Sequence, residues 1–288
     1  MSLKKLLLVG LCLGLGVAPV RAQEVDAVVK KIKATNSLTM GYRETIFPTG
    51  FLDENKKPAG YAVDMCLRII DDVKKELGTP DLKINYVPVN IQNRQALVAN
   101  GTVDLECGGT VNTFARAKQV DFSPVTFIAS NQLLVLKNSG IHSFADLAGK
   151  ILVVATGGSS EPELKKLLEE TKLNIRVQNV DDHAAALIAV ESRRADAYFS
   201  DNSAFMGLVK GSKHPENLAI VGEEIGYAPQ AFMVPKNNPT FLWIVDHAMA
   251  KMFQSGEAAT IFNKWFEPYG LTVTPKLRAA WATFSYPE

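Results

Sequence analysis

The sequence predicts an α/β protein with two lobes, each built on a mainly parallel sheet that helices cover. The first observation is the order strand-helix-strand-helix-strand, which occurs within residues 38–107 and again within 149–201. Parallel strands need crossover connections, usually helices, so each occurrence indicates one helix-covered sheet. The second observation is length, because the residues that follow the first 22 suit one or two α/β domains with a proper core.

The first unit opens with a strand at 38–44, with the sequence LTMGYRE. A helix follows at 61–78, because apolar residues recur on one helical face and Gly78 supplies a stop signal. That face consists of Val63, Leu67, Ile70 and Val73. The unit is completed by a strand at 82–89, a short helix at 93–101 and a strand at 102–107.

The second unit begins with a strand at 149–156 and a helix at 161–170, where Ser160 and Glu163 fit a capping box. A strand at 173–180 comes next, followed by a helix from residue 183 that either of two aspartates caps. These are Asp181 and Asp182. The remaining predicted elements are a strand at 195–201, a strand near 230–234 that fits either lobe, and helices at 240–253 and 258–266.

Residues 1–22 have the features of a secretory signal peptide. MSLKK is basic, LLLVGLCLGLGV is a short apolar run, and VRA is a small-residue cleavage pattern. The run is too short to span a membrane, and Cys12 follows a leucine where a lipid anchor needs a small residue. We therefore expect cleavage after Ala22 and export to the periplasm as a soluble protein.

Cleavage would remove three basic residues and no acidic ones, which leaves 28 basic against 30 acidic residues and a net charge of −2. This balance argues against nucleic acid as a partner. Only Cys66 and Cys107 would remain, and the sequence leaves open whether they pair or stay as two buried thiols. The chain has no phosphate-binding loop, no nucleophile elbow and no metal-ligand spacing among its histidines, so we expect no cofactor and no metal.

Ligands of open parallel sheets bind beyond the carboxyl ends of the strands. In the first unit these ends present Arg43, residues 90–94 and residues 107–116. In the second unit they present residues 156–160, Asp182 with His183, and Asp201. Two of these places, GGTVNTFAR and ATGGSSEPE, are expected to combine a strand end, a glycine turn and a helix N-terminus, which favours a bound anion. Arg116 would then lie in the first turn of its helix, where it can pair with a carboxylate.

The charges at this edge predict the kind of ligand. Arg43, Arg94 and Arg116 are positive, His183 is a potential fourth cation, and Asp201 is negative. A ligand with two carboxylates and one ammonium group complements this set, and acidic amino acids fit that description. Each of these residues alone is more often a surface or structural residue, so the prediction depends on their common location.

Seven stretches, taken in order, carry a family resemblance. They are GYRE (41–44), VNIQNR (89–94), ECGGTVNTFARAKQVDFS (106–123), SFADLAGK (143–150), ATGGSSE (155–161), DDH (181–183) and FSDNSAF (199–205). Together they resemble the periplasmic solute-binding proteins of polar amino acid ABC importers, family 3, and most closely the glutamate/aspartate-binding members. The resemblance covers essentially the whole chain after the predicted signal peptide.

The resemblance implies a type II periplasmic binding protein fold whose two lobes close on a ligand. Lobe 1 would comprise residues 23–127 and 228–288, lobe 2 residues 128–227, and a two-segment hinge would lie near 126–131 and 224–227. It also implies a monomer without enzymatic activity. Such a protein binds L-glutamate or L-aspartate and delivers it to the membrane permease of an ABC importer.

The resemblance further implies nine ligand-binding residues: Arg43, Arg94, Gly109, Thr110, Arg116, Gly158, Ser159, His183 and Asp201. Arg116, with the backbone at Gly109 and Ser159, would hold the ligand α-carboxylate. Asp201 would accept from the α-ammonium. The side-chain carboxylate would be held by Arg43, Arg94 and His183.

The sequence departs from the family pattern where the family usually has hydroxyl residues, because Gly109 and Val111 stand at these positions. The flanking residues Thr110 and Thr113 are expected to point elsewhere. One acceptor for the ammonium group is therefore missing, a loss worth about 1.5–3 kcal/mol. Either the affinity for an amino acid is weaker, or the ligand is a dicarboxylate without an amine. Two other classes are a dehydratase-type enzyme on the same fold, with His183 as its proton-transfer group, and a sensory module.

Overall fold

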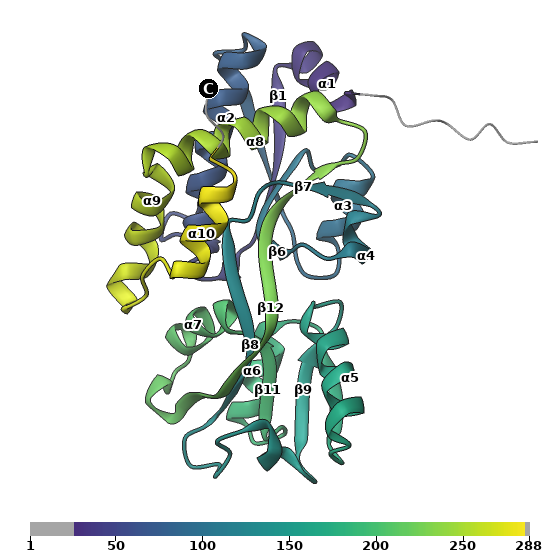
Figure 1. The fold of residues 1–288 in the computed structure, drawn as a ribbon, viewed down its shortest axis with the longest axis vertical. Coiled ribbons are helices and arrows are strands. Elements are labelled where there is room, and N and C mark those ends of the chain that lie inside the picture. Colours follow the sequence, from purple (N-terminus) through teal and green to yellow (C-terminus); the bar gives the residue numbers. More distant parts are fainter. Residues whose placement is uncertain (1–25, 286–288) are drawn as a thin grey trace, which may run out of the picture.

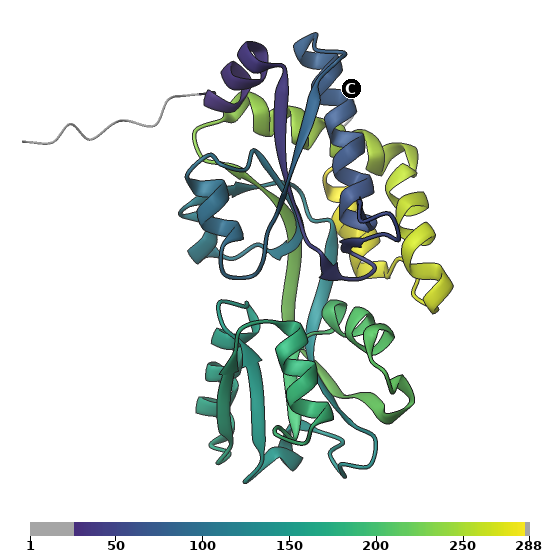
Figure 2. The ribbon, with the colours of Figure 1, turned by 180° about the vertical axis from the view of Figure 1, so that it is seen from behind.

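The computed structural model describes residues 26–285, which form two bodies connected by two long strands (Figure 1). These strands are β8 (Phe127–Leu136) and β12 (Leu218–Pro235). Figure 2 shows the same two strands passing between the bodies from the opposite side. The predicted signal peptide, residues 1–22, lies outside the described residues. Within residues 26–285, no helix combines the length and the apolar character needed to cross a membrane.

The upper body in Figure 1 contains the first predicted unit and the C-terminal helices. Its elements are α1 (Ala27–Thr35), β1 (Ser37–Tyr42), β2 (Thr45–Ile46), β3 (Gly50–Leu52), β4 (Pro58–Ala59), α2 (Tyr61–Leu77), β5 (Lys83–Pro88), α3 (Arg94–Ala99), β6 (Leu105–Val111), α4 (Phe114–Ala117), β7 (Val120–Phe122), α8 (Pro239–Ser255), α9 (Glu257–Phe266), η3 (Glu267–Tyr269) and α10 (Pro275–Thr283). The C-terminal helices α8, α9 and α10 therefore pack on the body that the chain builds first.

The lower body contains the second predicted unit. Its elements are η1 (Phe144–Leu147), β9 (Ile151–Ala155), α5 (Ser160–Thr171), β10 (Arg176–Val180), α6 (His183–Glu191), β11 (Ala197–Asp201), α7 (Asn202–Gly211) and η2 (Pro215–Asn217). The caps differ in part from the prediction. Asp182 caps α6 by accepting from the Ala185 N–H at 2.8 Å, as expected for one of the two candidates. The predicted capping box at Ser160 is wrong, because its hydroxyl donates instead to Asn131 Oδ1 at 2.6 Å.

The predicted α/β fold is confirmed, and its sheet order is β10-β9-β11-β8-β12-β6-β1-β5, with β7 added beside β12. The groups β5-β1-β6 and β10-β9-β11 are parallel and place the first strand of each unit in the middle. Since β8 and β12 pair with each other in both bodies, the two predicted sheets are joined by hydrogen bonds into one continuous sheet. That pairing is irregular between Val221 and Ala228, beside the predicted hinge segments 126–131 and 224–227.

The main core lies in the upper body, where α2 packs against α8, α9 and the central strands. Cys66 of α2 and Cys107 of β6 are both fully buried there and form a disulfide. The alternative of two free thiols is therefore not what the structure has. In the lower body, separate apolar clusters lie on the two faces of the sheet, one under α6 and α7 and the other under α5.

Strand β6 is longer than predicted, because it continues through both glycines to Val111. The glycine turn expected after residue 107 is therefore wrong. Thr110 of β6 pairs with Ala231 of β12, and Glu106 pairs with Met233. Between these two pairs, β6 has two more residues than β12. These extra residues form a bulge, and Gly109 has a φ of 64° that suits glycine.

Candidate ligand-binding site

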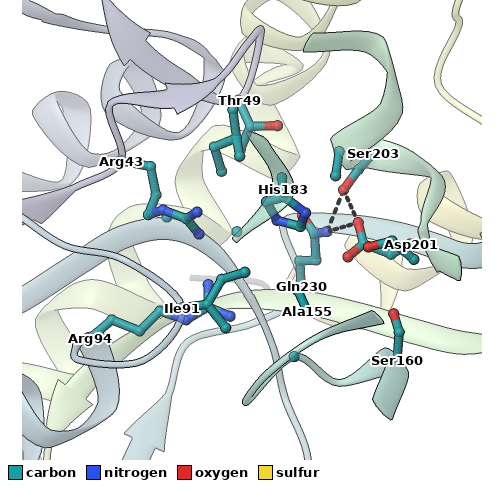
Figure 3. A pocket seen from close by; sticks show the side chains of 16 residues that line it. Arg43, Thr49, Ile91, Arg94, Ala155, Ser160, His183, Asp201, Ser203 and Gln230 are labelled. Atoms are coloured by element: carbon teal, nitrogen blue, oxygen red, sulfur yellow. Dashed lines mark hydrogen bonds between the residues drawn. The ribbon is translucent and has the colours of Figure 1, made fainter. Parts of the chain in front are cut away.

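A cavity lies between the two bodies, and side chains from both enclose it (Figure 3). Its upper wall consists of Arg43, Ile46, Thr49, Ile91, Arg94, Gly108, Gly109 and Gln230. Its lower wall consists of Ala155, Gly158, Ser160, His183, Ser200, Asp201, Ser203 and Ala204. Of the nine residues predicted to bind a ligand, six line this cavity: Arg43, Arg94, Gly109, Gly158, His183 and Asp201. The other three, Thr110, Arg116 and Ser159, do not line it.

The upper wall carries two buried guanidinium groups. Arg43 follows β1 and is 4% exposed, and Arg94 begins α3 and is 6% exposed. Neither guanidinium group donates a hydrogen bond to another residue of the described chain. Burial and the neighbouring Arg94 lower the pKa of Arg43 to about 10, although Glu106 and Asp201 raise it in part. Both groups are therefore charged at neutral pH and lack the partners that buried cations need.

Arg116 connects the two bodies beside the cavity. It lies in α4, and its backbone N–H is capped by the Thr113 hydroxyl at 3.3 Å. Its guanidinium group donates to the Val111 carbonyl at 2.8 Å and to the Gly157 carbonyl at 3.0 Å. Since α4 has four residues, it provides almost no helix dipole, and the positive charge here comes from the arginine itself.

The loop from β9 to α5 forms the neighbouring part of the lower wall. Gly158 lines the cavity, and Ser159 is the N-cap of α5 without a side-chain capping bond. The Gly157 N–H donates to Glu161 Oε2 at 3.1 Å, so one donor of this loop already has a carboxylate partner. The predicted strand-turn-helix arrangement is present here, although one of its donors is occupied.

Asp201 ends β11 and belongs to a small hydrogen-bonded group on the far side from the arginines (Figure 3). The Ser203 hydroxyl donates to its Oδ1 atom, and Gln230 Nε2 donates to Ser203 Oγ at 2.8 Å. Gln230 Nε2 also lies 3.4 Å from the same Oδ1 atom. Among the described residues, no hydrogen bond reaches Oδ2, so this oxygen remains available to a donor in the cavity.

His183 is the first residue of α6, and its Nδ1 atom lies 2.6 Å from the Tyr198 hydroxyl. Burial, with Arg43 and Arg94, lowers the pKa of His183 to about 3. The imidazole is therefore neutral at pH 7, and the prediction of a fourth positive charge is wrong. When the Tyr198 hydroxyl donates to Nδ1, the proton of the neutral ring is on Nε2 and can be donated into the cavity.

The sequence reasoning missed Glu106, which is fully buried directly before the disulfide cysteine. Its Oε2 atom accepts from the Thr110 hydroxyl at 2.8 Å, which explains why Thr110 faces away from the cavity. Gln230 and Ser203 were missed as well, because they belong to β12 and α7. The only sequence signal for Glu106 is a carboxylate inside an otherwise apolar strand, next to two glycines.

The bodies also touch outside the cavity, where α7 meets the loop between β2 and β3. Lys210 Nζ lies 3.7 Å from the centre of the Phe47 ring and 2.8 Å from the Tyr269 hydroxyl. A Cβ atom on Gly207 would lie 2.5 Å from the Phe47 carbonyl oxygen. Only glycine therefore permits this approach of the helix to the opposite backbone.

Comparison with known proteins identifies a matching family and similar proteins. Residues 38–268 match the sequence profile of the bacterial extracellular solute-binding proteins, family 3. The glutamate/aspartate import solute-binding protein of Salmonella typhimurium is 37% identical over 93% of this chain and 90% of its own length. The L-glutamate/L-aspartate-binding protein of Pseudomonas aeruginosa is 38% identical over 86% of this chain and 83% of its own length.

Solved structures show the same architecture. An ancestral arginine-binding protein bound to arginine has a TM-score of 0.70 and 31% identity, and the match covers 80% of this chain and 98% of that protein. A substrate-binding protein of an ABC uptake transporter from Streptococcus pneumoniae, with bound histidine, has a TM-score of 0.74 at 22% identity over 85% of this chain and 97% of that one. The second likeness concerns the fold alone.

Proposed function

The chain belongs to the bacterial extracellular solute-binding proteins, family 3, and on that premise we propose that it binds an acidic amino acid, L-glutamate or L-aspartate, between its two bodies. The observation that carries this proposal is the pair of buried guanidinium groups, Arg43 and Arg94, which have no hydrogen-bond partner among residues 26–285 and face Asp201 across the cavity. Buried cations of this kind call for a carboxylate ligand.

The proposed roles follow the charges. Arg43, Arg94 and the neutral His183 hold the side-chain carboxylate of the ligand. Arg116 holds the α-carboxylate together with backbone donors near Gly109 and Ser159. In the structure Arg116 donates to two carbonyl oxygens, and a charged carboxylate is a stronger acceptor than either. Asp201 accepts from the ammonium group through its free Oδ2 atom.

The position of the Gln230 side-chain oxygen favours an amino acid over an amine-free dicarboxylate as the ligand. Its side-chain oxygen lies so close to Gly109 that a Cβ atom there would come within 2.8 Å of it. A carbonyl-type acceptor thus occupies the region where a hydroxyl side chain at position 109 would extend. We propose that Gln230, with Ser203, replaces the acceptor that is lost at Gly109 and Val111. A dicarboxylate without an amine would leave both Asp201 Oδ2 and this oxygen unpaired.

We further propose that the protein is exported to the periplasm after cleavage at residue 22, acts as a monomer and delivers its ligand to the permease of an ABC importer. The lobes would be residues 23–127 with 228–288, and residues 128–227, and closure would occur about β8 and β12. The relatives named above support transport rather than turnover. His183 is a poor proton-transfer group, because its pKa of about 3 lies far from neutral.

Isothermal titration with L-glutamate, L-aspartate, L-glutamine and succinate tests the proposal, together with thermal shifts for the same ligands. A ligand that binds only the folded state raises its free energy of unfolding by an amount that grows with the logarithm of the ligand concentration divided by the dissociation constant. We expect glutamate or aspartate to bind most tightly, with glutamine and succinate weaker. Tightest binding of succinate would favour the amine-free alternative, and absence of binding by every acidic ligand would refute the assignment.

A further inference from the structure

Glu106 is a buried carboxylate that the site contains but the proposed contacts do not use. It lies in β6, is 0% exposed, and has one oxygen bonded to the Thr110 hydroxyl at 2.8 Å. Its other oxygen, Oε1, has no hydrogen-bond partner among the described residues. A buried carboxylate with an unpaired oxygen is costly unless nearby charges stabilise it.

Those charges are the three arginines of the site. A Cβ atom on Gly108 would lie 2.1 Å from Glu106 Oε1 and 2.8 Å from Arg43 Cγ, so both side chains converge on one face of that glycine. The pKa of Glu106 is raised overall, because burial outweighs the lowering by Arg94, the Thr110 hydroxyl, Arg43 and Arg116. In return, Glu106 raises the pKa of each arginine. The carboxylate is thus electrostatically linked to every cation of the site.

The charge of the site depends on this carboxylate. We take Glu106 as ionised because three guanidinium groups favour its charged form. Counted over Glu106 and the proposed ligand contacts, Arg43, Arg94 and Arg116 carry three positive charges, Glu106 and Asp201 carry two negative charges, and His183 is neutral. The site therefore has a net charge of +1. Glutamate and aspartate have a net charge of −1 at neutral pH, whereas a dicarboxylate without an amine has −2. Without Glu106 the site would have a net charge of +2, which matches the dianion.

We propose that Glu106 is a specificity-determining residue, whose negative charge beside Arg43 and Arg94 makes the site select an amino dicarboxylate over an amine-free dicarboxylate. It acts through the arginines and without touching the ligand, because it does not line the cavity. This inference rests on the proposed function. A like charge buried near the ligand disfavours a second ligand charge strongly, because the interior screens charges less than water does.

The test is the ratio of affinities for L-glutamate and succinate, measured by isothermal titration at fixed pH and salt. Glu106→Gln keeps the shape of the side chain and an oxygen that accepts from Thr110, but it removes the charge. We expect the ratio to shift toward succinate by about tenfold or more, as the loss of one buried like-charge contact predicts. Weaker binding of both ligands by the same factor, or unchanged affinities, would overturn the proposal.

Asp104→Asn is the matched control. Asp104 is equally buried and directly precedes β6, but it pairs with Lys31 Nζ at 2.6 Å and with the Thr39 N–H at 2.7 Å, away from the cavity. We expect this variant to lose stability without changing the ratio. A shift as large as that of Glu106→Gln would mean that any buried carboxylate of this sheet affects the ratio, and would also overturn the proposal.

A double variant keeps the test decisive if Glu106→Gln leaves the arginines too strongly repelled to fold. Combining Glu106→Gln with Arg43→Gln removes two adjacent opposite charges and restores the net charge of +1. Both affinities should fall, since Arg43 is a proposed ligand contact, but glutamate should still be preferred. Preference for succinate in the double variant would contradict the proposal. Failure of the wild type to bind either ligand would instead refute the proposed function.

Discussion

The two walls of the cavity differ in how their polar groups are partnered. In the lower wall, His183 is bonded to Tyr198 and Asp201 to Ser203, both within the same body. In the upper wall, Arg43 and Arg94 are almost fully buried and donate to no described residue. The buried polar groups of the upper wall therefore find hydrogen-bond partners only when a ligand binds. Those of the lower wall largely have partners without a ligand. We infer that the ligand docks on the upper wall and that the lower wall closes over it.

The difference has a structural origin. The upper wall combines the end of β1, the start of α3 and a bulged strand, where Gly108 leaves room for Glu106 and Arg43 to converge. The lower wall is built on the starts of helices, where side chains can bond to neighbours one turn away or on the adjacent strand. The positive charge of the cavity thus comes mainly from the upper body, and neutral hydrogen-bonding groups come mainly from the lower body.

The largest expected effect is on the upper wall. Arg94→Ala should weaken L-glutamate binding about 1,000-fold, or about 4 kcal/mol, because it removes one of the two buried cations proposed to hold the side-chain carboxylate of the ligand. Isothermal titration measures this loss, and Arg278→Ala, at an exposed position on α10, is the control. A loss no greater than that of the control would mean that the upper wall does not provide the ligand charge site.

The covalent link behind the upper wall should have the next largest effect. Replacing Cys66 and Cys107 together by alanine removes a cross-link between residues 41 positions apart. The free energy of unfolding should fall by about 3 kcal/mol, because the unfolded chain becomes less constrained. Urea denaturation of the ligand-free protein measures the change against the oxidised wild type, and reduced wild type should resemble the variant. An unchanged free energy would show that β6 does not depend on the disulfide.

Closure of the lower wall can be tested at Gly207. Gly207→Ala places a Cβ atom against the Phe47 backbone and should weaken glutamate binding about 30-fold, or about 2 kcal/mol, by keeping the bodies apart. Gly211→Ala is the matched control, because it lies in the same helix with nothing within 4 Å of its added Cβ atom. Equal affinities of the two variants would refute a role for this contact in closure.

The smallest expected effect concerns His183. Its pKa in the folded protein, about 3, is lower than the usual 6.5, so the unfolded chain binds more protons between these values and stability falls as the pH falls. Lowering the pH from 6.5 to 5.5 should cost the ligand-free protein about 1 kcal/mol through this residue. His183→Asn should remove that contribution, and exposed His142→Gln should retain it. An identical pH dependence in all three proteins would show that His183 is not buried in its neutral form.

Much of the upper wall could be predicted, because Arg43 and Arg94 follow strand ends that local patterns identify. Glu106 could not, since its place depends on a bulge that forms only when β12 pairs with β6. Gln230 and Ser203 were missed for a related reason. The path of β12 through both bodies, and the start of α7, are determined by contacts between distant segments. The charge state of His183 also depends on such neighbours, because Arg43 and Arg94 approach it from the other body.

The disulfide stands next to the carboxylate that we propose as the specificity determinant, because Cys107 directly follows Glu106 in β6. The strand that positions this charge packs against α2 in either case, but it is covalently linked to α2 only where thiols can be oxidised. Protein produced in a reducing cytosol and protein exported to an oxidising compartment would share a sequence but differ in this attachment. The oxidation state of the two cysteines is therefore a variable in any measurement of relative ligand affinities. A free-thiol assay should accompany each measurement.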